Sequence, residues 1–252
     1  MRQCLYGLLC LSVWYTATIP AFAQTHDFTS EAFGKAVREY LLNNPELVVE
    51  ALRAFEQKAE EARMADSRLA MEHFDLAQAS KDAFLIGDGP VTIVEFFDYQ
   101  CGFCKRSYPA LERLIAQGQI TVVSREFPIL GPVSTYAARA ALAAGRQGKY
   151  TTVHKALMEV RGQLSNERIN ALLMRMDLDM QQLRIDMEAP EVEAHIQGSY
   201  AIAQALNIRG TPAFIIGDDL HPGFLDEAAL QTIVQNARSD LDREPNSTDA
   251  PQ

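Results

Sequence analysis

The clearest pattern of apolar positions lies in the middle of the chain. Residues 91–97 form a run of β-branched and aromatic side chains with one charged member, Glu95. Such a run predicts a strand that is buried on both faces. Apolar positions in residues 105–117 recur at helical spacing, and residues 120–127 form a second strand-like run. We therefore predict a strand, a helix and a strand in succession, as in α/β proteins.

The second half of the chain mixes helical and strand patterns. Residues 133–188 are helical, with an Ala-rich stretch at 137–144, and a further helix is predicted over about 191–206. Beyond it the pattern predicts, in chain order, a strand at 213–216, a short strand near 220–223, a helix from 226 to about 237 and a disordered tail at 242–252.

Helical patterns also precede the first strand. One helix, capped by Thr29 or Ser30, ends near residues 43–45, and a second starts at Pro45. The second helix either folds back on its own domain or associates with other copies, and we expect segment 24–80 to form a dimer or trimer. This expectation rests on the heptad spacing of its apolar residues Val48, Leu52, Phe55, Ala59 and Ala62.

The first 23 residues have the features of a cleaved export signal. Arg2 precedes an apolar stretch that is too short to span a bilayer, and the stretch ends in Ala21-Phe22-Ala23. We expect cleavage after Ala23 and a periplasmic protein. The formal net charge is −10, and loss of Arg2 makes it one unit more negative. This charge disfavours nucleic acid and anionic membrane surfaces as partners.

Two of the four cysteines, Cys4 and Cys10, lie in the export signal. The other two, Cys101 and Cys104, lie between the predicted strand 91–97 and the helix after it. Unpaired N–H groups and the helix dipole stabilise a thiolate at a helix N-terminus and lower its pKa. We therefore predict that Cys101 is a nucleophile and that Cys104, one turn further in, resolves the mixed disulfide.

Two cysteines at this spacing also occur in proteins as a structural disulfide, as half of a zinc site or as two buried thiols. A disulfide that closes two residues constrains the chain very little. A tetrahedral zinc site needs four ligands, and the mature sequence has neither a second cysteine pair nor a His-rich cluster. We therefore expect redox chemistry without a cofactor or a metal.

Residues 87 to about 240 resemble the DsbA-like family of exported thiol:disulfide oxidoreductases, and we expect the corresponding domain to span 81–241. The resemblance rests on Glu-Phe-Phe-Asp-Tyr-Gln-Cys-Gly-Phe-Cys at 95–104, on Gly-Thr-Pro at 210–212 and on the order of elements. It implies an α/β thioredoxin fold with a helical domain inserted at about 132–188. The helices of segment 24–80 resemble those of the suppressor-of-copper-sensitivity C proteins, DsbA-like members with an oligomerising extension.

Four residues near the dithiol are further site candidates. By the resemblance, Pro212 is a cis-proline packed against the cysteines, and the backbone of Thr211 binds an extended substrate. Phe103 is a surface aromatic in the substrate groove or a plain packing residue. Glu95 is a buried proton relay for Cys104 or an acid paired with a Lys or Arg.

The sequence thus predicts an exported enzyme that forms or isomerises disulfides in unfolded or misoxidised secreted proteins, with a membrane redox partner that resets its dithiol. Gly-Phe between the cysteines differs from the Pro-His of the oxidase DsbA, and Thr before the proline matches the isomerase DsbC. Oxidase, isomerase and reductase roles therefore stay open. Alternatives are a copper carrier, since two thiolates suit Cu(I), and an oligomeric surface scaffold with a vestigial dithiol.

Overall fold

The computed structural model describes residues 31–72, 74–80 and 83–243. The chain divides into two compact units between Gln57 and Lys58. No described helix is both long enough and apolar enough to cross a bilayer.

Several predictions fall outside the described residues. These are the export signal with its cleavage after Ala23, the cap at Thr29 or Ser30, and residues 244–252 of the expected tail. They stay predictions.

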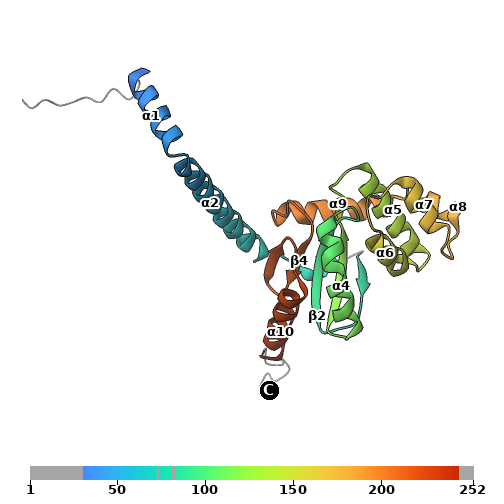
Figure 1. Ribbon diagram of the computed structural model, residues 1–252. Helices are drawn as coiled ribbons and strands as arrows, with labels where there is room; N and C mark the ends of the chain where they lie inside the picture. Colours follow the sequence, from blue (N-terminus) through green and yellow to red (C-terminus); the bar gives the residue numbers. More distant parts are fainter. Residues whose placement is uncertain (1–30, 73, 81–82, 244–252) are drawn as a thin grey trace, which may run out of the picture. The chain divides into compact units, whose positions relative to one another are not determined.

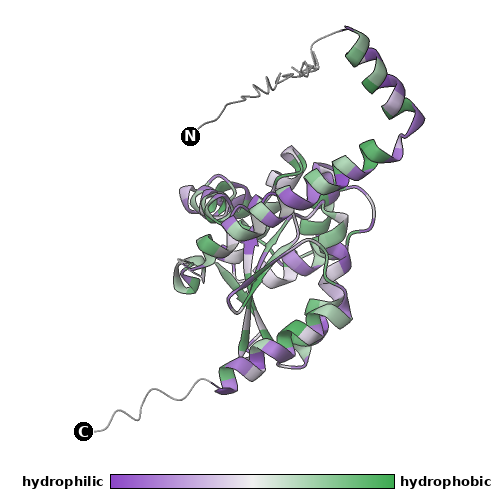
Figure 2. Ribbon diagram, turned by 90° about the vertical axis from the view of Figure 1, so that its left-hand side faces the viewer, coloured by the Kyte–Doolittle hydropathy of each residue, from purple (hydrophilic) through white to green (hydrophobic). Residues whose placement is uncertain are grey.

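The first unit consists of α1 (Glu31–Asn43) and the first turns of α2 (Glu46–Met71). The predicted break between two helices at 43–45 is confirmed. No residue of α1 is buried. Figure 2 shows hydrophobic residues interspersed with hydrophilic ones along both helices. On α2 the exposed apolar residues include three of the predicted heptad positions, Val48, Leu52 and Phe55.

The second unit is built on a five-stranded mixed sheet with the order β1-β3-β2-β4-β5. The central strands β2 and β3 are parallel, and every other neighbouring pair is antiparallel. All the predicted strands are present. The strands are β1 (Phe84–Ile86), β2 (Val91–Phe97), β3 (Ile120–Glu126), β4 (Ala213–Ile216) and β5 (Asp219–Pro222).

Helices cover both faces of this sheet (Figure 1). Ile93 and Val122 pack on α4 and α10, whereas Val94 and Val123 pack on α9 and on residues at the end of α2. Adjacent residues of one strand thus point into different layers of the core. The helices of this unit after α2 are α3 (Leu76–Ser80), α4 (Gly102–Ala116), α5 (Pro132–Arg146), α6 (Tyr150–Glu159), α7 (Asn166–Leu173), α8 (Met180–Asp186), α9 (Pro190–Ala205) and α10 (Glu227–Arg243).

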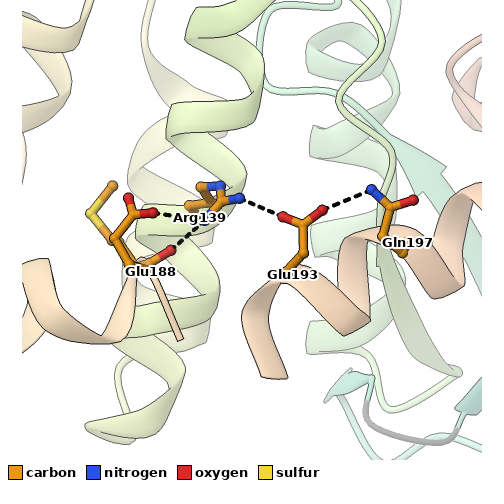
Figure 3. Close-up of polar contacts among 5 residues, drawn as sticks. Arg139, Glu188, Glu193 and Gln197 are labelled. Carbon is orange, nitrogen blue, oxygen red and sulfur yellow. Dashed lines mark hydrogen bonds and ion pairs between the residues drawn. The ribbon is translucent and has the colours of Figure 1, made fainter. Parts of the chain in front are cut away.

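Helices α5 to α8 occupy the stretch where the sequence predicts a helical insertion. Arg139 of α5 ties this group to the start of α9 (Figure 3). Its guanidinium donates to the carbonyl oxygen of Met187 at 2.8 Å and pairs with Glu188 and Glu193. Gln197 donates to the second oxygen of Glu193 at 2.8 Å. This polar cluster holds the α8–α9 junction against α5.

Strand β1 was not predicted, because three residues are too few to show a period of two. Its position depends on the insertion helices. Phe84 stacks on Tyr150 with ring centroids 3.9 Å apart. It also lies over Gly145, where any β-carbon would collide with its ring. Contacts between distant residues therefore place this strand.

The predicted end of the last helix is wrong. Helix α10 runs to Arg243 rather than to about Ala237, and it includes the first two residues of the expected tail 242–252. The added turns are exposed and are not held by the core. An ion pair between Arg243 and Asp240, 3.1 Å apart, lies along them. Apolar spacing cannot reveal a helical turn of this kind.

Candidate active site

A short turn joins β2 to α4 and places Cys101 as the N-cap of α4. The backbone N–H of Cys101 donates to the carbonyl oxygen of Asp98 at 3.0 Å. The carboxylate of Asp98 accepts hydrogen bonds from the backbone N–H groups of Gln100 and Leu130, at 2.7 and 2.9 Å. Asp98 therefore orders the turn before the cysteine. It was not singled out from the sequence, although an acid directly after a buried strand is a typical turn signal.

The two thiols are free and buried. The backbone N–H of Cys104 donates to the sulfur of Cys101 at 3.3 Å. The hydrogen bond with the Cys104 thiol is the largest influence on Cys101. Together with hydrogen bonds with Thr211 and from the backbone N–H groups of Cys104 and Phe103, it outweighs burial and lowers the pKa of Cys101 to about 6. Burial raises the pKa of Cys104 far above its ordinary value. At neutral pH this geometry favours a Cys101 thiolate beside a protonated Cys104.

The Thr211–Pro212 peptide bond is cis and lies next to Cys101. The thiol of Cys101 donates to the carbonyl oxygen of Thr211 at 3.2 Å. The carbonyl oxygen of Pro212 accepts from the backbone N–H of Gly223 at 2.8 Å. Thr211 and Pro212 also line an open groove of about 450 Å³, together with Met71 and residues of β5. Cys101 thus contacts a residue of the groove wall, although neither cysteine lines the groove itself.

Glu95 is buried in β2, on the same face of the sheet as Ile93. Its Oε1 has no hydrogen-bond partner, and no Lys or Arg of the described chain pairs with it. This environment argues against the alternative of an acid paired with a Lys or Arg. Burial and then the charge of Cys101 raise the pKa of Glu95 to about 8. Glu95 lines a cavity of about 240 Å³ with Tyr108 and His154. Its carboxyl group can exchange a proton near neutral pH.

Another buried acid, Glu126, ends β3 and was not singled out from the sequence. It accepts hydrogen bonds from the hydroxyls of Tyr99 and Tyr150, each at 2.9 Å. The hydroxyl of Tyr99 also lies 3.0 Å from Nδ1 of His154. Burial raises the pKa of Glu126 and lowers that of His154 to about 3. Tyr150 and His154 are one turn apart on α6, but Tyr99 and Glu126 come from two other segments, so no sequence spacing could have revealed the whole cluster.

The structure brings four of the predicted site residues together, Cys101, Cys104, Thr211 and Pro212. Phe103 lies on the first turn of α4 and is 52% exposed, so it is a surface aromatic, but it is not among the residues that line the groove. Within the described part of the chain, no three His, Cys, Asp or Glu side chains form a group that could hold a metal ion.

Two family models match the chain. A model of the DSBA-like thioredoxin domain matches residues 92–235. A model of the copper resistance protein ScsC N-terminal domain matches residues 31–62. The two matches fall on either side of residue 80, where the sequence pattern changes from helical to α/β.

Solved structures and one group of curated proteins are also similar. A thioredoxin-like oxidoreductase from Silicibacter pomeroyi shares 43% identity over 66% of this chain and 99% of its own, with a TM-score of 0.63. Proteus mirabilis ScsC in a transitional conformation shares 28% identity over 83% of this chain and 96% of its own, with a TM-score of 0.61. The Na(+)/H(+) antiporter NhaA 1 of Salinispora arenicola is 30% identical over 168 residues, and the matched part spans 26% of that protein.

These similarities agree with the geometry of the site. The DSBA-like model covers more than half of the chain, and the oxidoreductase from Silicibacter pomeroyi is matched over almost its whole length. The predicted thioredoxin fold with inserted helices is confirmed. The chain therefore belongs to the DSBA-like thioredoxin domain family.

Proposed function

We propose that the protein is a thiol:disulfide oxidoreductase that forms or isomerises disulfides in exported proteins. The observation that supports this function is the contrast between its thiols, since the pKa of Cys101 is lowered to about 6 and that of Cys104 is raised. The Cys101 thiolate attacks one sulfur of a substrate disulfide, and the other substrate sulfur leaves as a thiolate. Cys104 then loses its proton and attacks the mixed disulfide. This step releases the second substrate thiolate and leaves a Cys101–Cys104 disulfide; the reverse sequence oxidises a substrate.

Glu95 is proposed as the group that takes the proton of Cys104 in the second step. Its pKa of about 8 suits proton transfer near neutral pH. The cavity beside Glu95 extends to the part-buried Glu112 of α4 and to the exposed Lys155 of α6. A proton accepted by Glu95 therefore has a short route to solvent.

The proposed substrates are unfolded or misoxidised secreted proteins. An extended segment that lies along Thr211 and Pro212 would be held by its backbone, so that many sequences are accepted. A membrane redox partner would reset the dithiol after each turnover. We also propose export to the periplasm with cleavage after Ala23.

Assembly into a dimer or trimer through segment 24–80 is part of the proposal. The match of residues 31–62 to the ScsC N-terminal domain supports it, as do the exposed apolar residues of α2. Met71 and Ala79 pack against the sheet within the second unit, so these two residues are not available for assembly. Two or more dithiols around one substrate raise the effective concentration of thiol and favour isomerisation.

Refolding of scrambled ribonuclease, with the equilibrium of the dithiol against glutathione, tests this function. We expect the mature protein to restore ribonuclease activity and to exchange with glutathione, and we expect Cys101→Ser to do neither. A mature protein that neither restores ribonuclease activity nor exchanges with glutathione would contradict the proposal.

Copper carriage is a second candidate, favoured by the name of the family model that matches residues 31–62. The two thiolates of the dithiol would be soft ligands that suit Cu(I). Stoichiometric Cu(I) binding that persists in glutathione, without rescue of ribonuclease, would favour this candidate. Fast alkylation of Cys101 at about its pKa of 6 would argue against a scaffold with a vestigial dithiol.

A further inference from the structure

Two phenyl rings and a guanidinium form an exposed cluster beside the dithiol, here called the aromatic platform (Phe103, Arg106 and Phe224). The two phenylalanines are 52% and 41% exposed, and their ring centroids are 6.3 Å apart. The guanidinium carbon of Arg106 lies 4.3 Å from the ring centroid of Phe103 and 5.0 Å from that of Phe224. Both distances are within the range of cation–π attraction. The rings thus hold a cation at a defined point of the surface.

Hydrogen bonds on both sides of Phe224 fix the platform next to the site. The preceding residue, Gly223, donates its backbone N–H to the carbonyl oxygen of Pro212 at 2.8 Å. The carbonyl oxygen of the following residue, Leu225, accepts from the hydroxyl of Ser107 in α4 at 3.1 Å. Phe224 is therefore held between the cis-proline loop and the dithiol helix. Because Phe103 is two positions after Cys101, a substrate segment bound at this sulfur lies near the platform.

The positive charge of Arg106 has no carboxylate partner within the described chain, where it contacts the two rings. Arg113, two turns further along α4, differs because Glu227 binds it at 2.6 Å. Asp226, close in sequence to Phe224, accepts a hydrogen bond from the backbone of Ala229 at the start of α10. The N–H edge of Arg106 is thus available to a carboxylate from another molecule.

We propose that the aromatic platform selects substrate segments that carry an apolar side chain and a carboxylate close to the reacting cysteine. The apolar side chain packs on Phe103 and Phe224, and the carboxylate pairs with Arg106. This inference rests on the proposed function, because it names the class of substrate for the same site. The formal net charge of −10 would by itself favour basic segments, so a preference for acidic ones requires a local cause.

Peptide disulfides with matched flanking residues test this inference. Each peptide has one cysteine joined to a reporter thiol, and the neighbouring pair is Leu-Asp, Leu-Asn or Leu-Lys. Rates of reaction with the mature protein are divided by the rate with a small neutral disulfide, which corrects for changes in the dithiol itself. We expect Leu-Asp to react roughly two- to fivefold faster than Leu-Asn, the size of an exposed ion pair, and Leu-Lys to be slowest.

Two variants separate the platform from the overall charge. In Arg106→Glu we expect the preference to reverse, so that Leu-Lys reacts faster than Leu-Asp. Arg175→Glu changes the net charge equally at an exposed position after α7, and we expect it to keep the preference for Leu-Asp. Equal rates for Leu-Asp and Leu-Asn would overturn the inference but leave the proposed function standing. The same holds if the two variants change the preference between Leu-Asp and Leu-Lys equally. No reaction with the neutral disulfide would overturn the proposed function, and the inference with it.

Discussion

The sulfur of Cys101 lies 3.2 Å from the carbonyl oxygen of Thr211, a residue 110 positions further along the chain. The sheet accounts for this proximity. Strands β2 and β4 are antiparallel neighbours in which Phe96 is paired with Ala213, so the end of β2 meets the start of β4. The dithiol helix follows the first strand and the cis-proline precedes the second. A substrate that approaches the sulfur therefore meets the backbone of this loop.

Cys101 is expected to titrate with a midpoint near pH 6. Hydrogen bonding with Cys104 is the largest cause, so Cys104→Ala should raise the midpoint, whereas Cys104→Ser, which keeps a donor, should raise it less. The ultraviolet absorbance of the thiolate, followed against pH, measures this directly, and Cys101→Ser should lose the transition. A midpoint at or above about 8.5, the value of a free cysteine, would contradict the assignment of Cys101 as nucleophile.

Glu95→Gln should slow the resolution of the mixed disulfide, because the amide cannot accept the proton of Cys104. In the natural protein this rate should rise with pH as Glu95 ionises around pH 8. The variant should lose that rise. Stopped-flow measurement of peptide release across pH would show the difference. An unchanged profile in Glu95→Gln would mean that Glu95 does not carry the proton.

The same substitution makes a separate prediction for stability. The pKa of Glu95 is raised from 4.5 to about 8, so its contribution to stability is fully present below pH 4.5 and is lost as the pH rises toward 8. Glu95→Gln cannot ionise. The difference in unfolding free energy between Glu95→Gln and the natural protein should therefore change in favour of the variant. The change should be about 1.4 kcal/mol for each pH unit between 4.5 and 8. Urea unfolding of the reduced proteins at two pH values checks this, with the exposed Glu72→Gln as a control that should show no such trend.

Deletion of residues 24–57 should give a soluble monomer that keeps oxidase activity and loses isomerase activity. The remaining unit has its own buried clusters, and isomerisation should depend on several dithiols around one substrate. Leu52→Asp with Phe55→Asp in the full mature chain should have the same effect without shortening it. Light scattering gives the mass of each protein. A natural mature protein that is already monomeric at micromolar concentration would contradict both the assembly and the isomerase argument.

The tyrosine hydroxyls at Glu126 should matter for stability. Tyr150→Phe leaves a buried carboxyl group with one donor fewer, which should cost about 1–3 kcal/mol of unfolding free energy. Tyr136→Phe is a matched control, because its hydroxyl bonds the part-buried Asn170 at 2.7 Å and water can replace it. Urea unfolding compares the two variants. An equal loss in both would show that burial of Glu126 adds nothing to the effect.

Local sequence was sufficient to predict the elements that present the dithiol. The apolar run of β2, the helical spacing of α4 and the position of Cys101 at the helix start are all properties of neighbouring residues. Helix boundaries and strand periods depend on such short-range geometry. The Gly-Thr-Pro motif before β4 was identified through the family resemblance, and the bond within it is cis.

Only the tertiary structure decided which side chains meet. Strand alternation could not show whether Glu95 faces a basic partner or an apolar layer. The packing of α4 and the insertion helices around it decides this environment. No sequence pattern pointed to Phe224 as a residue of the site. It contacts Phe103 because the end of β5 and the start of α4 both lie next to the cis-proline loop. The sequence by itself determined the dithiol, its helix and the elements other than β1 and the last turns of α10, since these depend on residues a few positions apart. The polar cluster at Glu126 and the aromatic platform depend on residues that only the packed sheet brings within a few ångströms of one another.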